Sequence, residues 1–486
     1  MTFDPALRPR AHFAPRRNWM NDPNGLLFHD GEYHLYFQHN SRGWWPGFSS
    51  WGHAVSRDLV EWTELAVAIP STDDEFILSG SAVVDHRNVS GLGTPEGPAL
   101  VAIYTSFSPV TKIQRQSLAY STDGGRTFTP YAGNPIIDID SHDFRDPKLL
   151  RREDEFVMAI VMTQDRTVRL YESKNLLDWI LSSEVGPFGF TEGVWECPDI
   201  VLVPIEGGDD AAWVLLLSVQ SGGPAGGSGM QYLVVDYDGH TFTPIGEARW
   251  LDFGSDFYAG VAYTDAPAPV IHAWMNNWAY AANTPGEEFR GMMSLPRRLT
   301  LRRKGDDLVL VQRPVFREGP PLFEAHDVVV DGRHEFPNAE PAVRIVADFD
   351  AGTAARFGLD VRVGGDEATR VVVDRAAGTV SVDRTRSGLV RLARRRVPPE
   401  SPDFEAAEAA AHLEPQDIGA AHPAPLAETD RVTLEVFVDV SSVEVLAADG
   451  AVAVSDLIFP SPESTGIVAF ADGGVARLRS LTVSAL

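Results

Sequence analysis

The chain has 486 residues, of which 44% are hydrophobic, and it carries a formal net charge of −27. This length exceeds what one hydrophobic core usually organises, so two globular domains are expected. The acidic balance argues against nucleic acid or an anionic membrane as a partner, because both favour basic surfaces.

Several local features bear on compartment and cofactors. Cys197 is the single cysteine, which excludes an intrachain disulfide. Residues 1–15 lack the apolar core of a signal peptide, so the chain as given is expected to be cytoplasmic; a secreted protein whose leader had been removed would look the same. No spacing typical of a metal site and no glycine-rich phosphate loop is present, so neither metal nor cofactor is expected.

Short apolar or alternating runs of strand length recur through the first 300 residues, separated by clusters of Gly, Pro, Asp and Ser. They lie at residues 33–37, 100–107, 156–162, 213–219, 232–235 and 270–274. Long amphipathic helical patterns are absent. The fold is therefore predicted to be all-β.

A loose repeat indicates how these strands are arranged. A strand, a polar turn and then an aromatic residue recur at residues 54–65, 119–131, 170–181 and 234–244. A spacing of roughly 50 to 65 residues suits a four-stranded propeller blade enlarged by loops. With a closing unit near residues 290–301 the chain would have five blades, although the repeat alone allows four to six. The predicted propeller domain spans residues 1–301.

The pattern changes after residue 301. A predicted linker, 302–325, contains Pro314, Pro320 and Pro321. Strand-like runs with Asp-Gly turns follow and predict an antiparallel β-sandwich over residues 326–486. An Ala- and Glu-rich insertion at 400–414 is expected to be a short helix or a disordered loop. This domain is assigned to stability, with contacts to substrate or to a second copy in a homodimer as further roles.

The most informative motif is WMNDPNG at residues 19–25. Pro23 biases Asp22 away from the right-handed helical region, while Asn24 and Gly25 accept turn geometry. An ordinary turn would explain this segment in isolation. Asp22 becomes a catalytic candidate because two further carboxylates occupy unusual settings.

Those carboxylates are Asp146 and Glu196. The guanidinium of Arg145 is expected to keep Asp146 ionised. Glu196 lies between Trp195 and Cys197, which are expected to exclude water from its carboxyl and so favour the protonated form. One ionised acid and one neutral acid are what glycosidic bond cleavage requires.

These segments resemble the signature motifs of glycoside hydrolase family 32, the invertase, inulinase and levanase family. The resemblance runs nearly end to end. It rests on WMNDPNG at 19–25, FRDP at 144–147 and WECPD at 195–199, together with SGSAVV from Ser79, LDFGSDFYAG from Leu251, WMNNWAYA from Trp274 and VSSVEVLAADG from Val440. The fold it implies is a five-bladed β-propeller followed by a β-sandwich.

The resemblance also implies catalytic roles. Asp22 would be the nucleophile, Glu196 the general acid/base and Asp146 the transition-state stabiliser. In a propeller they would converge from the innermost strands of blades one, three and four on a blind pocket, which suits attack on a chain end. A retaining mechanism would place the two reacting carboxyls about 5 to 5.5 Å apart.

Seven further residues are predicted to contact substrate. Some match sugar contacts of the family and some supply flat apolar faces; the competing roles are turn amides, ion pairs and core packing. The candidates are Asn21, Gln38, Trp45, Trp51, Ser81, Arg145 and Trp274. Asp252 and Asp256 are expected to order the site from behind.

The predicted function is that of a retaining, exo-acting β-fructofuranosidase. It would remove terminal β-D-fructofuranosyl units from levan- or inulin-type fructans, fructooligosaccharides or sucrose through a covalent fructosyl-enzyme. A fructosyltransferase using the same double displacement and a propeller that binds fructosides without cleaving them are the alternatives. Residues 44–51 depart from the family pattern by one extra residue, which leaves the preferred linkage open.

Overall fold

The computed structural model describes residues 7–486 except 153–154, 287, 338–339, 396, 398, 400 and 402–413. Across the described residues the regular elements are β-strands and two short 3-10 helices, η2 (Ala281–Asn283) and η3 (Ala448–Gly450). The all-β prediction is confirmed. Most of the predicted insertion at 400–414 lies outside the described residues. Within them, no helix has the length and apolarity needed to cross a membrane.

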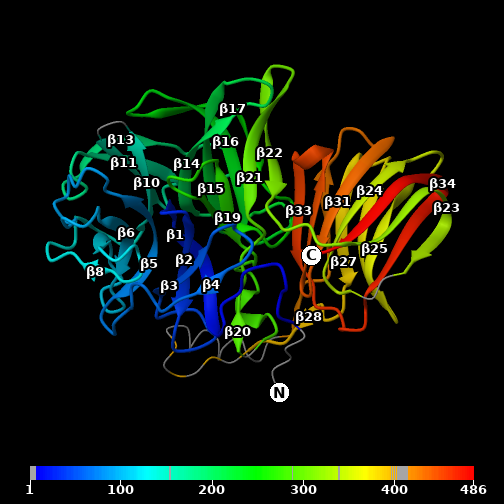
Figure 1. Cartoon of the computed structure of the whole chain (residues 1–486), viewed down its shortest axis with the longest axis horizontal. Coiled ribbons are helices and arrows are strands. Elements are labelled where there is room, and N and C mark those ends of the chain that lie inside the picture. Colours follow the sequence, from blue (N-terminus) through cyan, green and yellow to red (C-terminus); the bar gives the residue numbers. More distant parts are fainter. Residues whose placement is uncertain are drawn as a thin grey trace.

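The first domain is a propeller of five antiparallel sheets (Figure 1). Blade one contains β1 (Asn18–His29), β2 (Glu32–Asn40), β3 (Ser50–Ser56) and β4 (Thr63–Glu64), with β20 (Phe289–Arg290) parallel to β1. Blade two contains β5 (Phe76–Val84), β6 (Leu100–Phe107), β7 (Gln114–Ser121) and β8 (Thr129–Pro130), with β9 (Ile137–Ser141) beside β7. Blade three contains β10 (Phe144–Arg152), β11 (Glu155–Met162), β12 (Thr167–Ser173) and β13 (Ile180–Val185).

Blade four contains β14 (Trp195–Pro204), β15 (Ala211–Val219), β16 (Gly229–Tyr237) and β17 (Phe242–Trp250), and blade five contains β18 (Tyr258–Ala262), β19 (Val270–Trp274), β21 (Arg297–Lys304) and β22 (Asp307–Pro314). The first strands of neighbouring blades contact one another in a closed ring, from β1 through β5, β10, β14 and β18 back to β1. The predicted repeat corresponds to the third and fourth strands of blades one to four.

The predicted domain boundary at residue 301 falls inside the fifth blade. β21 and β22 pair continuously from Lys304 and Asp307 to Arg297 and Pro314, so the propeller extends to Pro314. The charged residues at the tip of this hairpin resemble a linker in the sequence. The sandwich begins earlier than predicted, with β23 (Pro321–Phe336).

The second domain is a nearly closed, sandwich-like sheet, which confirms the predicted architecture (Figure 1). Its longest strand, β34 (Gly466–Ala485), pairs with β25 (Arg356–Gly364) along its first half and with β24 (Val343–Asp350) along its second half, so it belongs to both layers. The remaining strands are β26 (Glu367–Asp374), β27 (Thr379–Arg386), β28 (Arg391–Leu392), β29 (Gln416–Asp417), β30 (Ala421–Pro425), β31 (Arg431–Val438), β32 (Ser442–Ala447) and β33 (Val452–Leu457).

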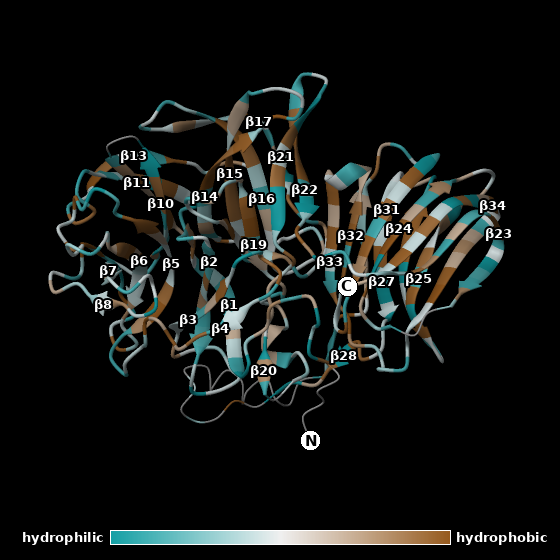
Figure 2. Ribbon diagram, in the orientation of Figure 1, coloured by the Kyte–Doolittle hydropathy of each residue, from teal (hydrophilic) through white to brown (hydrophobic). Residues whose placement is uncertain are grey.

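Apolar side chains of both layers fill the sandwich core, and separate apolar clusters lie within and between the blades. Figure 2 shows the apolar residues concentrated along the strands of both domains. Burial of alternate residues along the sandwich strands, as in β24, explains the alternating pattern of the sequence.

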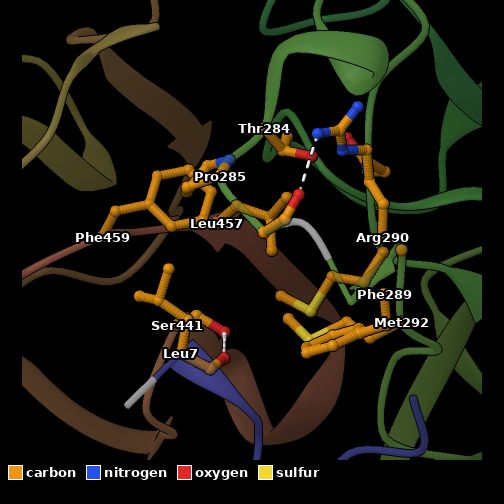
Figure 3. A pocket seen from close by; sticks show the side chains of 13 residues that line it. Leu7, Thr284, Pro285, Phe289, Arg290, Met292, Ser441, Leu457 and Phe459 are labelled. Carbon is orange, nitrogen blue, oxygen red and sulfur yellow. Dashed lines mark hydrogen bonds between the residues drawn. The ribbon is translucent and has the colours of Figure 1, made fainter. Parts of the chain in front are cut away.

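The two domains pack against each other along β33. Figure 3 shows a cavity at this interface with side chains from both domains. Its lining includes Thr284, Phe289 and Met292 from the propeller and Leu457 and Phe459 from the sandwich. A volume of about 30 Å³ is far below the several hundred Å³ of a typical ligand pocket, so this cavity is too small to hold a sugar-sized ligand.

Candidate active site

All five innermost strands carry a register shift close to their N-terminal ends. The shifts lie between Met20 and Pro23, Ile77 and Gly80, Arg145 and Lys148, Glu196 and Asp199, and Tyr258 and Val261. A β-bulge at such a point bends the strand and turns a side chain out of the regular alternation. Three residues at the shifts adopt positive φ, namely Asp146 at 62°, Cys197 at 47° and Ala259 at 53°. The ring of bulges directs side chains of several blades to one place.

Asp22 lies in the bulge of β1 and is partly exposed. Its Oδ2 accepts a hydrogen bond of 2.7 Å from the hydroxyl of Ser79, and its Oδ1 accepts one of 3.1 Å from the amide of Asn21. Burial raises the pKa of Asp22 to about 6; the Ser79 hydroxyl opposes this increase, and the negative charge of Glu196 adds to it.

Asp146, on blade three, is held by hydrogen bonds to the two neighbouring blades. Its backbone N–H donates to Thr105 Oγ1 at 3.0 Å, and its Oδ2 accepts from the backbone N–H of Cys197 at 3.0 Å. Burial raises the pKa of Asp146 to about 7, although Arg145 lowers it. As predicted, Arg145 favours the ionised form of Asp146 from a distance of 3.9 Å, but burial outweighs this effect, and the short hydrogen bonds of the guanidinium go to another carboxylate.

That other carboxylate is Glu196. Its Oε1 accepts hydrogen bonds from Arg145 Nη2 at 2.7 Å and Nε at 3.2 Å, and its Oε2 accepts one from the Tyr258 hydroxyl at 2.5 Å. The predicted apolar surroundings are wrong. The Trp195 ring packs against Phe188 at a centroid distance of 5.0 Å, so Glu196 faces polar partners.

Cys197 lies between the two aspartates. Its Sγ is 3.8 Å from Asp22 Oδ2 and 3.7 Å from Asp146 Oδ2, and it follows Glu196 directly in the chain. Burial raises the pKa of the Cys197 thiol well above its ordinary value, so it acts as a neutral, weak donor. The structure thus brings Asp22, Asp146 and Glu196 together, from blades one, three and four.

Two more predicted binding residues border this centre. Asn21 accepts a hydrogen bond of 2.8 Å from Trp19 Nε1 and donates to Asp22. Gln38 lies opposite the β1 bulge and donates from Nε2 to the carbonyl of Ile77 at 3.1 Å. Asn21 and Arg145 therefore bond carboxylates of this centre directly, whereas Gln38 bonds the backbone beside it.

Four predicted binding residues are placed elsewhere. Trp51 and Trp274 are fully buried in apolar clusters and offer no face to a sugar. Ser81 donates to the carbonyl of Pro147 at 2.9 Å and accepts from the backbone N–H of Leu149, so it joins β5 to β10. Trp45, 6% exposed, packs against Trp44 with ring centroids 5.9 Å apart.

Ser79 and Tyr258 donate to carboxylates of this centre, and Thr105 accepts from the backbone N–H of Asp146; the sequence does not predict these three contacts. Ser79 and Ser81 would share one face of a regular strand, so sequence alone could not choose between them. The bulge between Ile77 and Gly80 separates their directions. Within the described residues, no group of three His, Cys, Asp or Glu is arranged to hold a metal ion.

Comparison with known proteins finds similarity along the whole chain. The family model "Glycosyl hydrolases family 32 N-terminal domain" matches residues 12–314, and "Glycosyl hydrolases family 32 C terminal" matches residues 325–485. The levanase of Bacillus subtilis (strain 168) is 38% identical over 502 residues, which cover 100% of this chain and 71% of that protein. The extracellular exo-inulinase of Aspergillus awamori is 35% identical over 524 residues, which cover 98% and 94%.

Solved structures agree. The crystal structure of exo-inulinase from Aspergillus awamori has a TM-score of 0.90 at 34% identity, covering 100% of this chain and 99% of that chain. Fructofuranosidase from Schwanniomyces occidentalis, complexed with fructose, has a TM-score of 0.86 at 30% identity, with the same coverage. Because both family models and these full-length relatives match, the chain belongs to glycosyl hydrolase family 32.

Proposed function

We propose that this protein is an exo-acting β-fructofuranosidase that cleaves terminal β-D-fructofuranosyl units with net retention. The observation that carries the proposal is the meeting of Asp22, Asp146 and Glu196 around the Cys197 thiol. The named activities of the relatives, which are levanase, exo-inulinase and fructofuranosidase, supply the substrate class.

The first step is transfer of the fructosyl unit to the enzyme. Glu196 donates a proton to the glycosidic oxygen while the carboxylate of Asp22 attacks C2 of the fructosyl unit, and the C2–O bond to the leaving sugar breaks. Arg145 and Tyr258 fix both oxygens of Glu196 at the start of this step. The product is an ester between Asp22 and C2.

The second step is hydrolysis of this ester. Glu196, now a carboxylate, accepts a proton from water as the water oxygen attacks C2, and Asp22 departs as the carboxylate. Fructose leaves with the anomeric configuration of the substrate. Asp22 and Glu196 then return to their starting protonation states.

Asp146 serves to bind the fructosyl unit and to stabilise charge. A sugar hydroxyl that donates to a carboxylate favours its ionised form. Substrate binding is therefore expected to lower the pKa of Asp146, which burial raises to about 7 in the free protein. Asp146 would then oppose the positive charge that develops on the fructosyl ring.

The test is product analysis by chromatography after separate incubation with sucrose, inulin and levan, with Asp22→Asn as the blank. Free fructose that accumulates from the outset without intermediate oligosaccharides is the expected result, and the relative rates name the preferred linkage. Oligosaccharides longer than the substrate would indicate fructosyl transfer in place of hydrolysis. No product from any of the three substrates would overturn the proposal and leave a fructoside-binding propeller.

A further inference from the structure

The chain reaches Tyr258 through a segment that is bound by the other domain. Residues 251–257 connect β17, the outermost strand of blade four, to β18, the innermost strand of blade five. This segment lies against β33, which ends the strand order of the sandwich sheet. The edge of the sandwich therefore meets the propeller directly before the tyrosine that bonds Glu196.

The backbones of the segment and of β33 are hydrogen-bonded. Phe253 N–H donates to the carbonyl of Ala453 at 2.9 Å, and Asp256 N–H donates to the carbonyl of Ser455 at 3.0 Å. Gly254 permits this approach, because a Cβ there would lie 2.1 Å from the carbonyl oxygen of Ser455. The segment docks on the edge of the sheet as closely as a strand would.

Two carboxylates complete the docking. Asp252 Oδ1 accepts from Ser455 N–H at 2.9 Å, and Asp256 Oδ2 accepts from Leu457 N–H at 2.8 Å. The two N–H groups are two residues apart and point to the same edge of β33. The aspartates thus occupy the places that the carbonyl groups of a neighbouring strand would take.

Buried cations fix these carboxylates. Arg384, on β27 of the sandwich, donates to Asp256 Oδ2 at 2.9 Å, and the Tyr280 hydroxyl donates to Asp256 Oδ1 at 2.5 Å. Arg297 donates to Asp252 at 2.9 Å. The side chains of both ion pairs are almost completely buried, which makes their geometry costly to change. Phe253 packs against the apolar core of the sandwich.

We propose that the sandwich domain orients the general acid/base: Arg384 and β33 hold Asp256, and Asp256 holds Tyr258, two residues later, against Glu196. Asp256 and Arg384 are positioning residues. The inference rests on the proposed function, which assigns proton transfer to Glu196. Tyr258 bonds Oε2 and Arg145 bonds Oε1, so a displaced Tyr258 would leave the carboxyl fixed on one side.

The test is the double variant Asp256→Asn/Arg384→Met, which removes both buried charges together and leaves neither unpaired. The substrates are sucrose, whose leaving sugar needs protonation, and p-nitrophenyl β-D-fructofuranoside, whose leaving group does not. We expect kcat/KM to fall about tenfold or more for sucrose and less than about threefold for the aryl fructoside. Equal losses for both substrates, or no loss, would overturn the proposal.

Two further variants separate positioning from loosening of the interface. Tyr258→Phe should show the same selective loss, and adding it to the double variant should lower kcat/KM for sucrose by no more than about twofold further. Independent, additive losses would contradict the inference. Asp439→Asn weakens another part of the same interface, where Asp439 bonds His12. It should lower the melting temperature and leave the ratio of the two kcat/KM values unchanged.

A readout without turnover keeps this inference distinct from the proposed function. Crystal structures of the wild type and the double variant should show the distance from the Tyr258 oxygen to Glu196 Oε2 increase from 2.5 Å in the wild type. An unchanged distance would overturn the positioning role. A wild type that cleaves no fructoside would overturn the proposed function, and the two structures would still decide the positioning.

Discussion

Two groups of carboxylates in this molecule differ in their balance of charge. At the centre of the propeller Asp146 and Glu196 lie near Arg145, and Asp22 lies near Glu196. Burial raises the pKa of Asp22 to about 6 and that of Asp146 to about 7. At pH 7 the folded centre therefore resists full ionisation.

The cluster of His12, Asp439, Glu444 and Arg297 at the domain interface has the opposite balance. His12 bonds both Asp439 and Glu444, and Arg297 bonds Glu444 as well. Burial favours the neutral acids, but the hydrogen bonds and charges of these cations hold the pKa of Asp439 and of Glu444 at about 2. Asp439 and Glu444 in turn raise the pKa of His12 to about 9, against the effect of its burial.

Burial alone therefore does not decide what a carboxylate does. Where cations match the acids, the cluster stabilises the contact between domains. Where the acids are in excess, the site holds groups that can accept or donate protons near neutral pH at a cost in stability. A substitution on one side of this balance should therefore change activity or stability in a defined direction.

The largest effect is expected from Asp22→Asn. Turnover should fall by about 10⁴-fold or more, because the nucleophile is lost. The fold should gain about 1 to 3 kcal/mol at pH 7. The folded pKa of about 6 exceeds the unfolded value, so ionisation above pH 4 destabilises the wild type and cannot occur in the variant. Urea unfolding at pH 4 and pH 7 measures the gain, and equal stability changes at both pH values would contradict this explanation.

Glu196→Ala should lower kcat/KM for sucrose by about 10³-fold, within the range of general acid catalysis. With an aryl fructoside and added azide, which needs no general base, turnover should recover and yield a fructosyl azide of retained configuration. The acid limb of the pH profile should move to lower pH, since Glu196 raises the pKa of Asp22. If no fructosyl azide formed, the result would contradict the role of Glu196 as the general acid/base.

His12→Gln tests the interface through its pH dependence. The folded pKa of His12 lies above the unfolded value of 6.5, so its contribution is complete below pH 6.5 and disappears as the pH rises through 9. The wild type should lose up to about 3 kcal/mol of unfolding free energy between pH 6.5 and 9. Glutamine does not titrate, so the variant should be less stable at pH 6.5 and lack this loss. If the unfolding free energies of the wild type and the variant changed with pH in parallel, His12 would be excluded as the source of the loss.

The smallest effects concern two serines of β5. Ser79→Ala removes a hydrogen bond that lowers the pKa of Asp22, so the acid limb of kcat/KM should move to higher pH. Ser81→Ala is the matched control, because its hydroxyl bonds only the backbone of β10 among the described contacts. It should lower stability by about 1 to 2 kcal/mol and leave the pH limb in place. If the acid limb moved in Ser81→Ala but not in Ser79→Ala, Ser79 would not be the serine that tunes the pKa of Asp22.

The fold and the three carboxylates could be predicted from the sequence, since strand periodicity and motif resemblance both depend on residues close together in the chain. The partners of the carboxylates could not. Arg145 precedes Asp146 in sequence, yet its guanidinium crosses to Glu196 on the next blade. A bulge decides that Ser79 and not Ser81 contacts Asp22.

The prediction that Trp51 and Trp274 contact substrate is wrong for a related reason. Trp51 lies on the third strand of its blade and Trp274 on the second, where packing between sheets buries both rings. Motif membership does not reveal the distance of a strand from the propeller axis. The clamp of Asp252 and Asp256 on β33 likewise depends on residues about 200 positions away in the chain.

The most direct test of the double displacement at Asp22 and Glu196 is methanolysis of sucrose, with the trapped product identified by NMR. Methanol takes the place of water in the second step and gives a stable glycoside that preserves the configuration at C2. We expect methyl β-D-fructofuranoside from the wild type and none from Asp22→Asn. Methyl α-D-fructofuranoside would contradict the double displacement, because a single displacement would then have occurred.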